Sequence, residues 1–563
     1  MQTKPLQIEI SNGAINKNIV KRVESALSVE TLRESRIHAH GINVIGEGVG
    51  FYDTTLEEKV QEALADPHKT LLDNATILGL TPESINPLDK NAAQALIRAK
   101  VQERDEKHRA NRKLESLYLD ELGVDGAIKI HMCRGPFDSR ITDVDTPNPD
   151  QEEAFRYVQE QLKDGRRVQI ALGPGMAEYQ TPDGEIRKNT TVFINKETGK
   201  LETGETYFHI PTQPGEVESW QKYCRFIADK CKGADFDIWI EPNHNLDDNG
   251  HGNFQHNTDL ARHGEFSSSG RTPAEYAVAV VAASQAIKET NPEAKIGINL
   301  AFVDTDYAVQ TFEAIRQIGQ DPTKVVDYVS FNPYRFGKRP EDCGPKWNEN
   351  LAGNRGENAP KGKFDWSTTG KYEDEAVEFI ERVGVQGVKD IRIGESGWPK
   401  ESLTEEQRAQ YNLRGWILDR YIGLPESPWT LSSESEDFSL VKNNGEKTPT
   451  YWAYRNFNKI FTTTTRPVGE IQTSNDGIIC KVFEDETSHD KILVIWKATD
   501  YYDTNKPQDE SDNVDLVFSQ ESDVEITSKL TTTEPETETK KSKTIQIKVS
   551  GEPVIVRRKP SSS

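Results

Sequence analysis

The chain has 563 residues, of which 69 are Lys or Arg and 92 are Asp or Glu, so its formal net charge is −23 at pH 7. Because attraction to phosphates needs a basic surface, this balance argues against a nucleic-acid partner. We expect neither a membrane span nor a signal peptide, and hence a cytoplasmic location, since no apolar run has the length that either needs. The five cysteines form no C-x-x-C pair and are expected to be free thiols.

Residues 1–36 form an N-terminal extension, and from 37 to 462 short β-branched runs alternate with longer amphipathic stretches. This alternation predicts a parallel α/β sheet. Strands are expected at 40–46, 126–132, 167–172, 236–240, 295–302, 325–331, 391–394 and 429–433. Eight strands favour a closed (β/α)8 TIM barrel, with a doubly wound open sheet as the alternative.

Two crossover helices between these strands have clear starting signals. One begins with the capping box Thr272-Pro273-Ala274-Glu275, and the other with Thr404 followed three residues later by Gln407. The stretch at about 54–122, which includes a charge-rich run from Asn91 to Leu122, is interpreted as a helical insertion in the barrel domain. After residue 462 short alternating strands replace the helical period, and this predicts a small C-terminal β-sandwich over 463–563.

Three long irregular stretches, at 173–215, 241–271 and 333–370, all follow predicted strands. In a barrel the segments after strands gather on one face, so these three would wall a single cleft. Two carboxylates stand where that cleft would open, Glu241 after the strand FDIWI and Glu395 after IRIG. Glycoside hydrolysis needs this pair, one carboxylic acid to protonate the leaving oxygen and one carboxylate as nucleophile or as base for water.

The sequences around the pair resemble a known family. FDIWIEPNHN around Glu241 and RIGESGWP around Glu395 are similar to the acid/base and nucleophile motifs of clan-A retaining glycoside hydrolases, and DYVSFNPYR is similar to that clan's sixth-strand motif. The resemblance implies a retaining O-glycosidase acting on a carbohydrate substrate without a cofactor or metal. It implies Glu241 as acid/base, Glu395 as nucleophile and Tyr334 as the residue that orients the nucleophile.

Substrate-binding residues are expected in the same motifs and on the second strand, at His131, Asn243, His244, Asn332 and Trp398. Trp398 has two open interpretations, stacking on a sugar face or packing in the barrel. Trp347, Phe364 and Trp366 in the loop after the sixth strand are either anchors of that loop or sugar platforms.

The sequence departs from the clan's pattern at three places. Ile240 precedes Glu241 where the clan usually has Asn, and the second strand has no Arg, which leaves Lys129, His131 or Arg134 as substitutes. The clan's eighth strand usually ends near a Trp that supports a sugar ring, whereas here Trp429 stands at the start of that strand. These departures motivate an alternative function, a catalytically inactive barrel that binds carbohydrate or acts as a scaffold.

Three rival motifs fail on spacing. His244, His251, His256 and His263 match no zinc signature, and Gly46, Gly48 and Gly50 do not have the G-x-G-x-x-G spacing of a dinucleotide site. Around Ser396, Trp398 stands where a serine-hydrolase elbow needs glycine. The sequence therefore favours the glycosidase.

Overall fold

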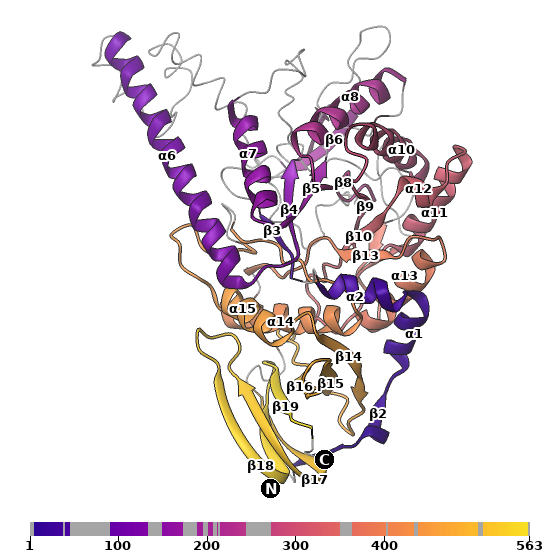
Figure 1. Ribbon diagram of the computed structural model, residues 1–563, viewed down its shortest axis with the longest axis vertical. Coiled ribbons are helices and arrows are strands. Elements are labelled where there is room, and N and C mark those ends of the chain that lie inside the picture. Colours follow the sequence, from indigo (N-terminus) through magenta and orange to yellow (C-terminus); the bar gives the residue numbers. More distant parts are fainter. Residues whose placement is uncertain are drawn as a thin grey trace.

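The computed structural model of the chain describes residues 5–37, 40–44, 90–132, 149–172, 189–194, 201–206, 211, 214–243, 272–348, 363–400, 403–432, 437–504 and 510–560. Figure 1 shows a helix-covered barrel with a separate strand-rich unit beneath it. None of the described helices has both the length and the apolar composition needed to cross a membrane.

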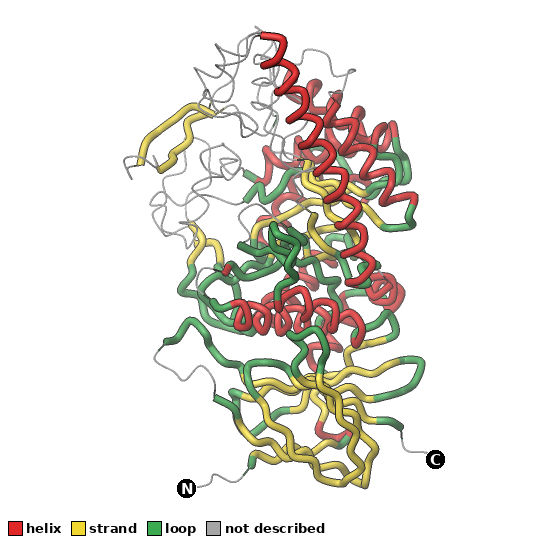
Figure 2. Tube along the Cα trace, turned by 90° about the vertical axis from the view of Figure 1, so that its left-hand side faces the viewer, coloured by secondary structure: helices red, strands yellow, loops and turns green. Residues whose placement is uncertain are grey.

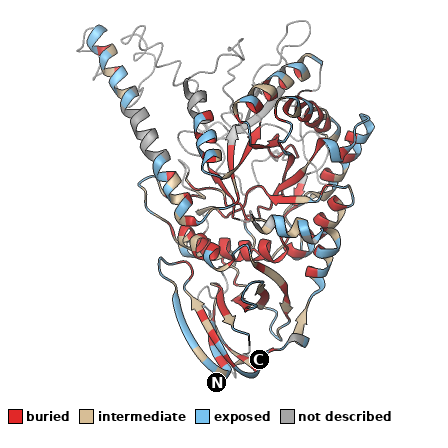
Figure 3. Ribbon diagram, in the orientation of Figure 1, coloured by how far each residue is buried: buried red, intermediate tan, exposed pale blue. Residues whose placement is uncertain are grey.

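The barrel is built on a seven-stranded parallel sheet in the order β13-β10-β9-β8-β5-β4-β3. Its strands are β3 (Ile42–Val44), β4 (Ala127–Met132), β5 (Arg167–Leu172), β8 (Asp235–Ile238), β9 (Ile296–Ala301), β10 (Tyr328–Asn332) and β13 (Asp390–Ile393). All six residues of β9 are buried, as expected for a parallel strand covered on both faces. Figure 3 shows the buried residues concentrated in these strands and in the inner faces of the helices.

Residues 426–431 close the barrel between its two edge strands. On one side, the N–H groups of Gly41 and Asn43 donate to the carbonyls of Glu426 and Pro428, at 2.9 and 3.1 Å. On the other side, Ser396 and Pro428 form a parallel bridge. The predicted (β/α)8 TIM barrel is confirmed, although its closing segment pairs about three residues earlier than the strand expected at 429–433.

Helices cover the outside of this sheet. They are α1 (Asn18–Ala26), α2 (Val29–Ile37), α6 (Lys90–Leu122), α7 (Pro149–Lys163), α8 (Pro214–Lys230), α10 (Pro273–Thr290), α11 (Thr305–Gln317), α12 (Pro322–Val325), α13 (Tyr372–Gly384), α14 (Glu405–Tyr421) and α15 (Pro449–Ile460), with a short 3-10 helix at Asn12–Ala14. Both predicted capping boxes are present, at Thr272 before α10 and at Thr404 before α14. The charge-rich run predicted to be helical forms α6, a single helix that extends beyond the barrel in Figure 1.

The C-terminal region forms a mixed eight-stranded sheet in the order β1-β17-β19-β16-β15-β14-β2, with β18 paired to β17. Its strands are β14 (Thr465–Ile471), β15 (Ile478–Asp485), β16 (Lys491–Lys497), β17 (Asp512–Ser528), β18 (Glu536–Val549) and β19 (Val554–Arg558), joined by the N-terminal β1 (Leu6–Ile10) and β2 (Ile15–Asn16). Figure 2 shows these strands gathered at one end of the molecule. Two hairpins, β6 (Asn189–Ile194) with β7 (Leu201–Thr206) and β11 (Lys346–Asn348) with β12 (Lys363–Asp365), lie in the loops that follow β5 and β10.

The C-terminal sheet packs on the barrel through alternate residues of β15 and β16. Side chains of a strand point in turn to opposite faces of the sheet. Ile492, Val494 and Trp496 belong to the barrel's hydrophobic core, whereas Leu493 and Ile495 belong to the separate core of the C-terminal sheet. One strand therefore stabilises two cores.

Candidate active site

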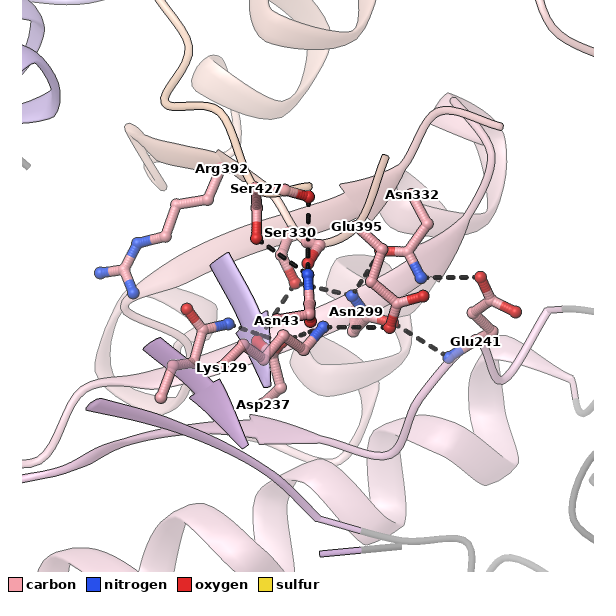
Figure 4. Close-up of polar contacts among 12 residues, drawn as sticks. Asn43, Lys129, Asp237, Glu241, Asn299, Ser330, Asn332, Arg392, Glu395 and Ser427 are labelled. Carbon is pink, nitrogen blue, oxygen red and sulfur yellow. Dashed lines mark hydrogen bonds and ion pairs between the residues drawn. The ribbon is translucent and has the colours of Figure 1, made fainter. Parts of the chain in front are cut away.

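Glu241 and Glu395 follow β8 and β13 at the carboxyl ends of the barrel strands, and both side chains lie in a shared polar network (Figure 4). Glu241 is 8% exposed and Glu395 is 5% exposed. A barrel gathers the segments after its strands at one face, so the pair occupies the face where barrel enzymes place their catalytic groups.

The backbone at Glu241 adopts a conformation that few side chains accept. The φ angles of Trp239 and Glu241 are 59° and 48°, in the left-handed region, which costs roughly 1–3 kcal/mol per residue. The Glu241 N–H donates to Asn299 Oδ1 at 3.2 Å, and the Asn332 amide donates to Glu241 Oε1 at 2.7 Å. These two asparagines hold the strained segment and direct its carboxylate.

Glu395 contacts a phenolic hydroxyl and a cation. The Tyr334 hydroxyl donates to Glu395 Oε2 at 3.1 Å, and Lys129 Nζ lies 3.5 Å from Glu395 Oε1. Lys129 belongs to β4, which is not adjacent to β13 in the sheet, so its side chain reaches Glu395 through the barrel interior. The same ammonium group lies 3.1 Å from Asp237 Oδ2, on β8.

Hydrogen bonds from three strands connect the remaining groups. Gln169 Nε2 donates to Asp237 Oδ2 at 2.6 Å, and Ser330 Oγ donates to Asp237 Oδ1 at 3.1 Å. The Asn299 amide donates to Ser330 Oγ at 2.9 Å and to Asn332 Oδ1 at 3.1 Å. The environments of the two glutamates are therefore linked by one continuous set of buried polar side chains.

Gly394 makes room for this network. A Cβ atom at residue 394 would lie 2.4 Å from Asn332 Oδ1, 2.6 Å from Asn299 Nδ2 and 3.3 Å from Lys129 Nζ. Any larger residue there would displace the groups that hold both glutamates, so the glycine is part of the site.

Burial raises the pKa of both carboxyls. The pKa of Glu395 rises to about 7, because burial and the negative charge of Glu241 outweigh Lys129 and the Tyr334 hydrogen bond. Burial also raises the pKa of Glu241, against the Asn332 hydrogen bond and the charge of Lys129. Two acids that influence each other in this way titrate as a pair, and the pair can hold a single proton near neutral pH.

The other predicted site residues have varied surroundings. Asn243 is 3% exposed, and its amide donates to the Ala301 carbonyl at 2.9 Å and to Asp304 at 3.0 Å, so it ties the segment after β8 to the end of β9. Asn332 holds Glu241, as described above. His131 lies in β4, with its side chain outside the described part of the structure, and His244 is outside the described residues.

The geometry favours packing for Trp398. Its side chain is 2% exposed, lies in a cluster with Leu403, Tyr411 and Tyr501, and donates from Nε1 to the Lys338 carbonyl at 3.2 Å. Its contact with a sugar stays an untested prediction.

An aromatic cluster extends outward from Tyr334. The Tyr334 ring stacks on Phe336 with 4.9 Å between centroids, and Phe336 in turn faces Trp366 at 6.3 Å. Three tryptophans at the margin of the cluster are only partly buried; they are Trp347, Trp366 and Trp429. Trp347 and Trp366 lie on and beside the β11–β12 hairpin, which packs against the end of β9 through Phe302 and Phe364.

Sequence reasoning did not identify Asp237, Asn299 or Gly394 as site residues, and it left Lys129 as one of three candidates. Two of them could have been recognised as polar residues inside otherwise apolar predicted strands. They are Asp237 in FDIWI and Asn299 in KIGINLAF.

Among the described residues no group of three or more His, Cys, Asp or Glu side chains is placed to hold a metal ion. The cysteines at 224, 231, 343 and 480 are free and buried, as predicted.

No family model matches the sequence, and no curated protein matches it. Among solved structures, the chain is similar to a family 39 glycoside hydrolase from the gut symbiont Bacteroides cellulosilyticus WH2, with 11% identity, a TM-score of 0.49, and 78% of this chain and 77% of that chain covered. It is also similar to CelM2, a bifunctional glucanase-xylanase from a metagenome library, with 10% identity, a TM-score of 0.47 and coverage of 79% and 94%. A GH30 endoxylanase from Clostridium papyrosolvens C71 shares 8% identity, with a TM-score of 0.45 and coverage of 99% and 100%.

Proposed function

We propose that this chain is a glycoside hydrolase that cleaves O-glycosidic bonds of a carbohydrate by a retaining double displacement. Glu395 is the nucleophile and Glu241 the acid/base. The observation that carries the proposal is the unlike surroundings of two buried glutamates at the ends of β8 and β13. Glu395 contacts the Lys129 cation and the Tyr334 hydroxyl, whereas Glu241 accepts from the neutral Asn332 amide.

These surroundings favour one proton arrangement for the pair. A cation and a hydroxyl donor stabilise a carboxylate, so the shared proton is better placed on Glu241. Protonation of Glu241 also removes the negative charge that raises the pKa of Glu395. The pair then consists of an ionised nucleophile and a protonated acid, as a retaining glycosidase needs before the first step.

In the first step a Glu395 oxygen attacks the anomeric carbon while Glu241 gives its proton to the leaving oxygen, so that the glycosidic C–O bond breaks and a glycosyl ester forms. In the second step Glu241 takes a proton from water, and the resulting hydroxide oxygen displaces Glu395 from the anomeric carbon. The Tyr334 hydroxyl keeps Glu395 in position through both steps. The partly buried tryptophans Trp366 and Trp429, which lie in the cluster that includes Tyr334, offer ring surface for the apolar face of a sugar.

The test is covalent trapping with activated 2-deoxy-2-fluoro glycosides, followed by intact mass and peptide mapping. We expect an adduct on Glu395 in the unaltered chain and none in E395Q.

E241Q is expected to lower turnover by roughly 10²–10⁴-fold, the usual contribution of general acid–base catalysis. As a control, E426Q removes another fully buried carboxyl, on the segment that closes the barrel, and should leave trapping intact. Full turnover in E395Q contradicts the proposal.

The alternative, an inactive carbohydrate-binding barrel, rests on Ile240. This residue is 6% exposed and has no polar group to offer a sugar hydroxyl where the resemblance leads one to expect Asn. Sugar binding with equal affinity in the unaltered chain, E241Q and E395Q, without turnover in any of them, is the result expected of that alternative.

A further inference from the structure

Lys129 lies between two carboxylates. Its ammonium nitrogen is 3.1 Å from Asp237 Oδ2 and 3.5 Å from Glu395 Oε1, and the residue is 1% exposed. The cation therefore has one partner that belongs to the proposed reaction and another that does not. The shorter contact is to Asp237, the partner outside the reaction.

Asp237 is fully buried, at 0% exposure. Besides Lys129, it accepts hydrogen bonds from Gln169 and Ser330, both neutral. Among the described residues, the titratable groups that face this part of the barrel come from separate elements. They are Lys129 on β4, Asp237 on β8, Glu241 after β8, Tyr276 on α10, Tyr328 on β10 and Tyr334 after it, and Glu395 after β13.

We propose that Asp237 sets the pH range of the reaction by sharing the Lys129 cation with Glu395. The inference rests on the proposed function, because it concerns the nucleophile. A buried cation favours the ionised form of each nearby carboxyl, and it does so more strongly where it has no second anion beside it. Because Asp237 makes the shorter contact with the Lys129 ammonium group, Glu395 receives only part of this stabilisation. Glu395 therefore ionises at a higher pH than it would if residue 237 were uncharged.

A purely structural role for Asp237 leads to a different expectation. A buried lysine needs a counter-ion, and removing that counter-ion usually destabilises the fold because a charge is left unpaired. Here Glu395 remains as a second anion within reach of Lys129. Loss of the Asp237 charge should therefore move the cation toward the nucleophile, and a structural role alone would not produce that change in ionisation.

The experiment is the pH dependence of kcat/KM for D237N, with the full chain and an activated aryl glycoside that the unaltered enzyme turns over. Asn keeps the size of the side chain and can still accept from Ser330. We expect the acidic limb, which reports ionisation of Glu395, to move to lower pH by about one unit, the lower end of the effect of a close opposite charge on a carboxyl. A limb that stays in place or moves to higher pH overturns the inference. D237S, which is also neutral, replaces D237N in the same test if that variant does not fold.

Asp235 provides the matched control. It lies two residues earlier on β8, so its side chain points to the same face of the strand. It pairs with Arg167 at 2.7 Å and with Arg392 at 3.1 Å in place of Lys129. D235N removes the same charge from the same strand, and its acidic limb should stay in place. An equal movement in D235N and D237N would show a general effect of charge and would overturn the inference.

A second readout separates this inference from the proposed function. The carboxyl of Glu395 can be titrated without substrate by NMR after 13C labelling of glutamate, with E395Q to assign the resonance. If turnover and trapping both fail, the glycosidase proposal fails, and the titration still tests Asp237. If trapping succeeds while the Glu395 titration is the same in D237N and the unaltered chain, only the Asp237 inference fails.

Discussion

Neighbours of different charge give the two glutamates of this barrel different chemistry. Lys129 and Tyr334 contact Glu395, and an asparagine amide contacts Glu241. Lys129 and Asn332 belong to strands, whose positions are rigid in a closed sheet, and Tyr334 lies two residues after β10. The position of each donor is therefore set by the barrel itself, which is the arrangement that preorganised catalytic sites require.

Replacing Tyr334 by Phe tests the contribution of one donor. Y334F removes a hydrogen bond to an ionised group, a contact worth about 1.5–3 kcal/mol, so we expect kcat/KM to fall roughly 10- to 100-fold. That hydrogen bond lowers the pKa of Glu395, so its loss raises this pKa above about 7. The acidic limb of the pH profile of kcat/KM should thus move to higher pH, which is the opposite of the direction expected for D237N. Unchanged kinetics across the pH range would contradict the orienting role of Tyr334.

The sequence allowed part of the site to be predicted. That Glu241 and Glu395 lie at the same face could be predicted, because each follows a recognisable strand and parallel strands end at one face. Asp237 and Lys129 lie within strands that are not adjacent in the sheet. Whether two such side chains meet inside the barrel depends on how far the sheet curls. Hydrophobic periodicity carries no information about that curvature, so their ion pair could not be predicted.

At the scale of elements, one buried carboxylate, Glu341 in the loop after β10, joins helix α14 to the C-terminal sheet. Arg414 is 0% exposed and donates to Glu341 from Nε at 2.8 Å and from a terminal nitrogen at 2.5 Å. The Trp496 indole of β16 donates to the same carboxylate at 2.7 Å. Burial alone would raise the pKa of Glu341, but Arg414 and these hydrogen bonds hold it below its ordinary value.

E341Q should destabilise the fold, because it leaves the Arg414 charge buried without its partner. We expect a loss of roughly 3–5 kcal/mol in the free energy of unfolding, the usual cost of breaking a buried pair. A carboxyl whose pKa is lowered by folding stabilises above its unfolded pKa and loses this contribution as the pH falls through its folded pKa. The difference between E341Q and the unaltered chain should therefore shrink toward acidic pH in denaturant titrations. A difference that is constant with pH would show that the charge of Glu341 is not the cause.

Element types were easier to predict than the way the barrel closes. Strands such as β5, and helices with capping boxes such as α10, combine local signals that agree with the fold. The closing segment at 426–431 pairs with its neighbours through isolated bridges and single hydrogen bonds, so it is not a regular strand that a two-residue period would mark. No strand was predicted at β1 within the N-terminal extension, although LQIEI alternates apolar and polar residues. Its partner strand is more than 500 residues away, so no neighbouring segment of the sequence indicates the pairing.

At the scale of the whole molecule, the barrel and the C-terminal sheet share buried surface. Phe483 of β15 lies against Phe461 and Tyr421, with ring centroids 5.0 and 6.1 Å away, and all three belong to the barrel's core. Lys481 of β15 pairs with Glu373 of α13 at 2.7 Å. The sheet therefore covers apolar surface that the barrel would otherwise expose to water.

We expect a chain ending at residue 462 to be insoluble or to unfold at much lower temperature than the full chain, since exposed apolar patches of this kind promote aggregation. The full chain should unfold in one calorimetric transition, because residues of β15 and β16 in the C-terminal sheet complete the barrel's core. Two separate transitions, or a soluble and active barrel without residues 463–563, would contradict this view of the interface.

The parallel pairing of β1 with β17 affects the order in which the chain can fold during synthesis. Leu6 pairs with Val514 and Ile10 with Phe518, so this segment meets its neighbour only after more than 500 further residues have been synthesised. At about 5–20 residues per second, the 508 residues between these partners take roughly 25–100 s to translate. Throughout that interval the exposed edge of LQIEI is available to other extended chains, and a chaperone that binds short apolar strands would have its natural substrate there.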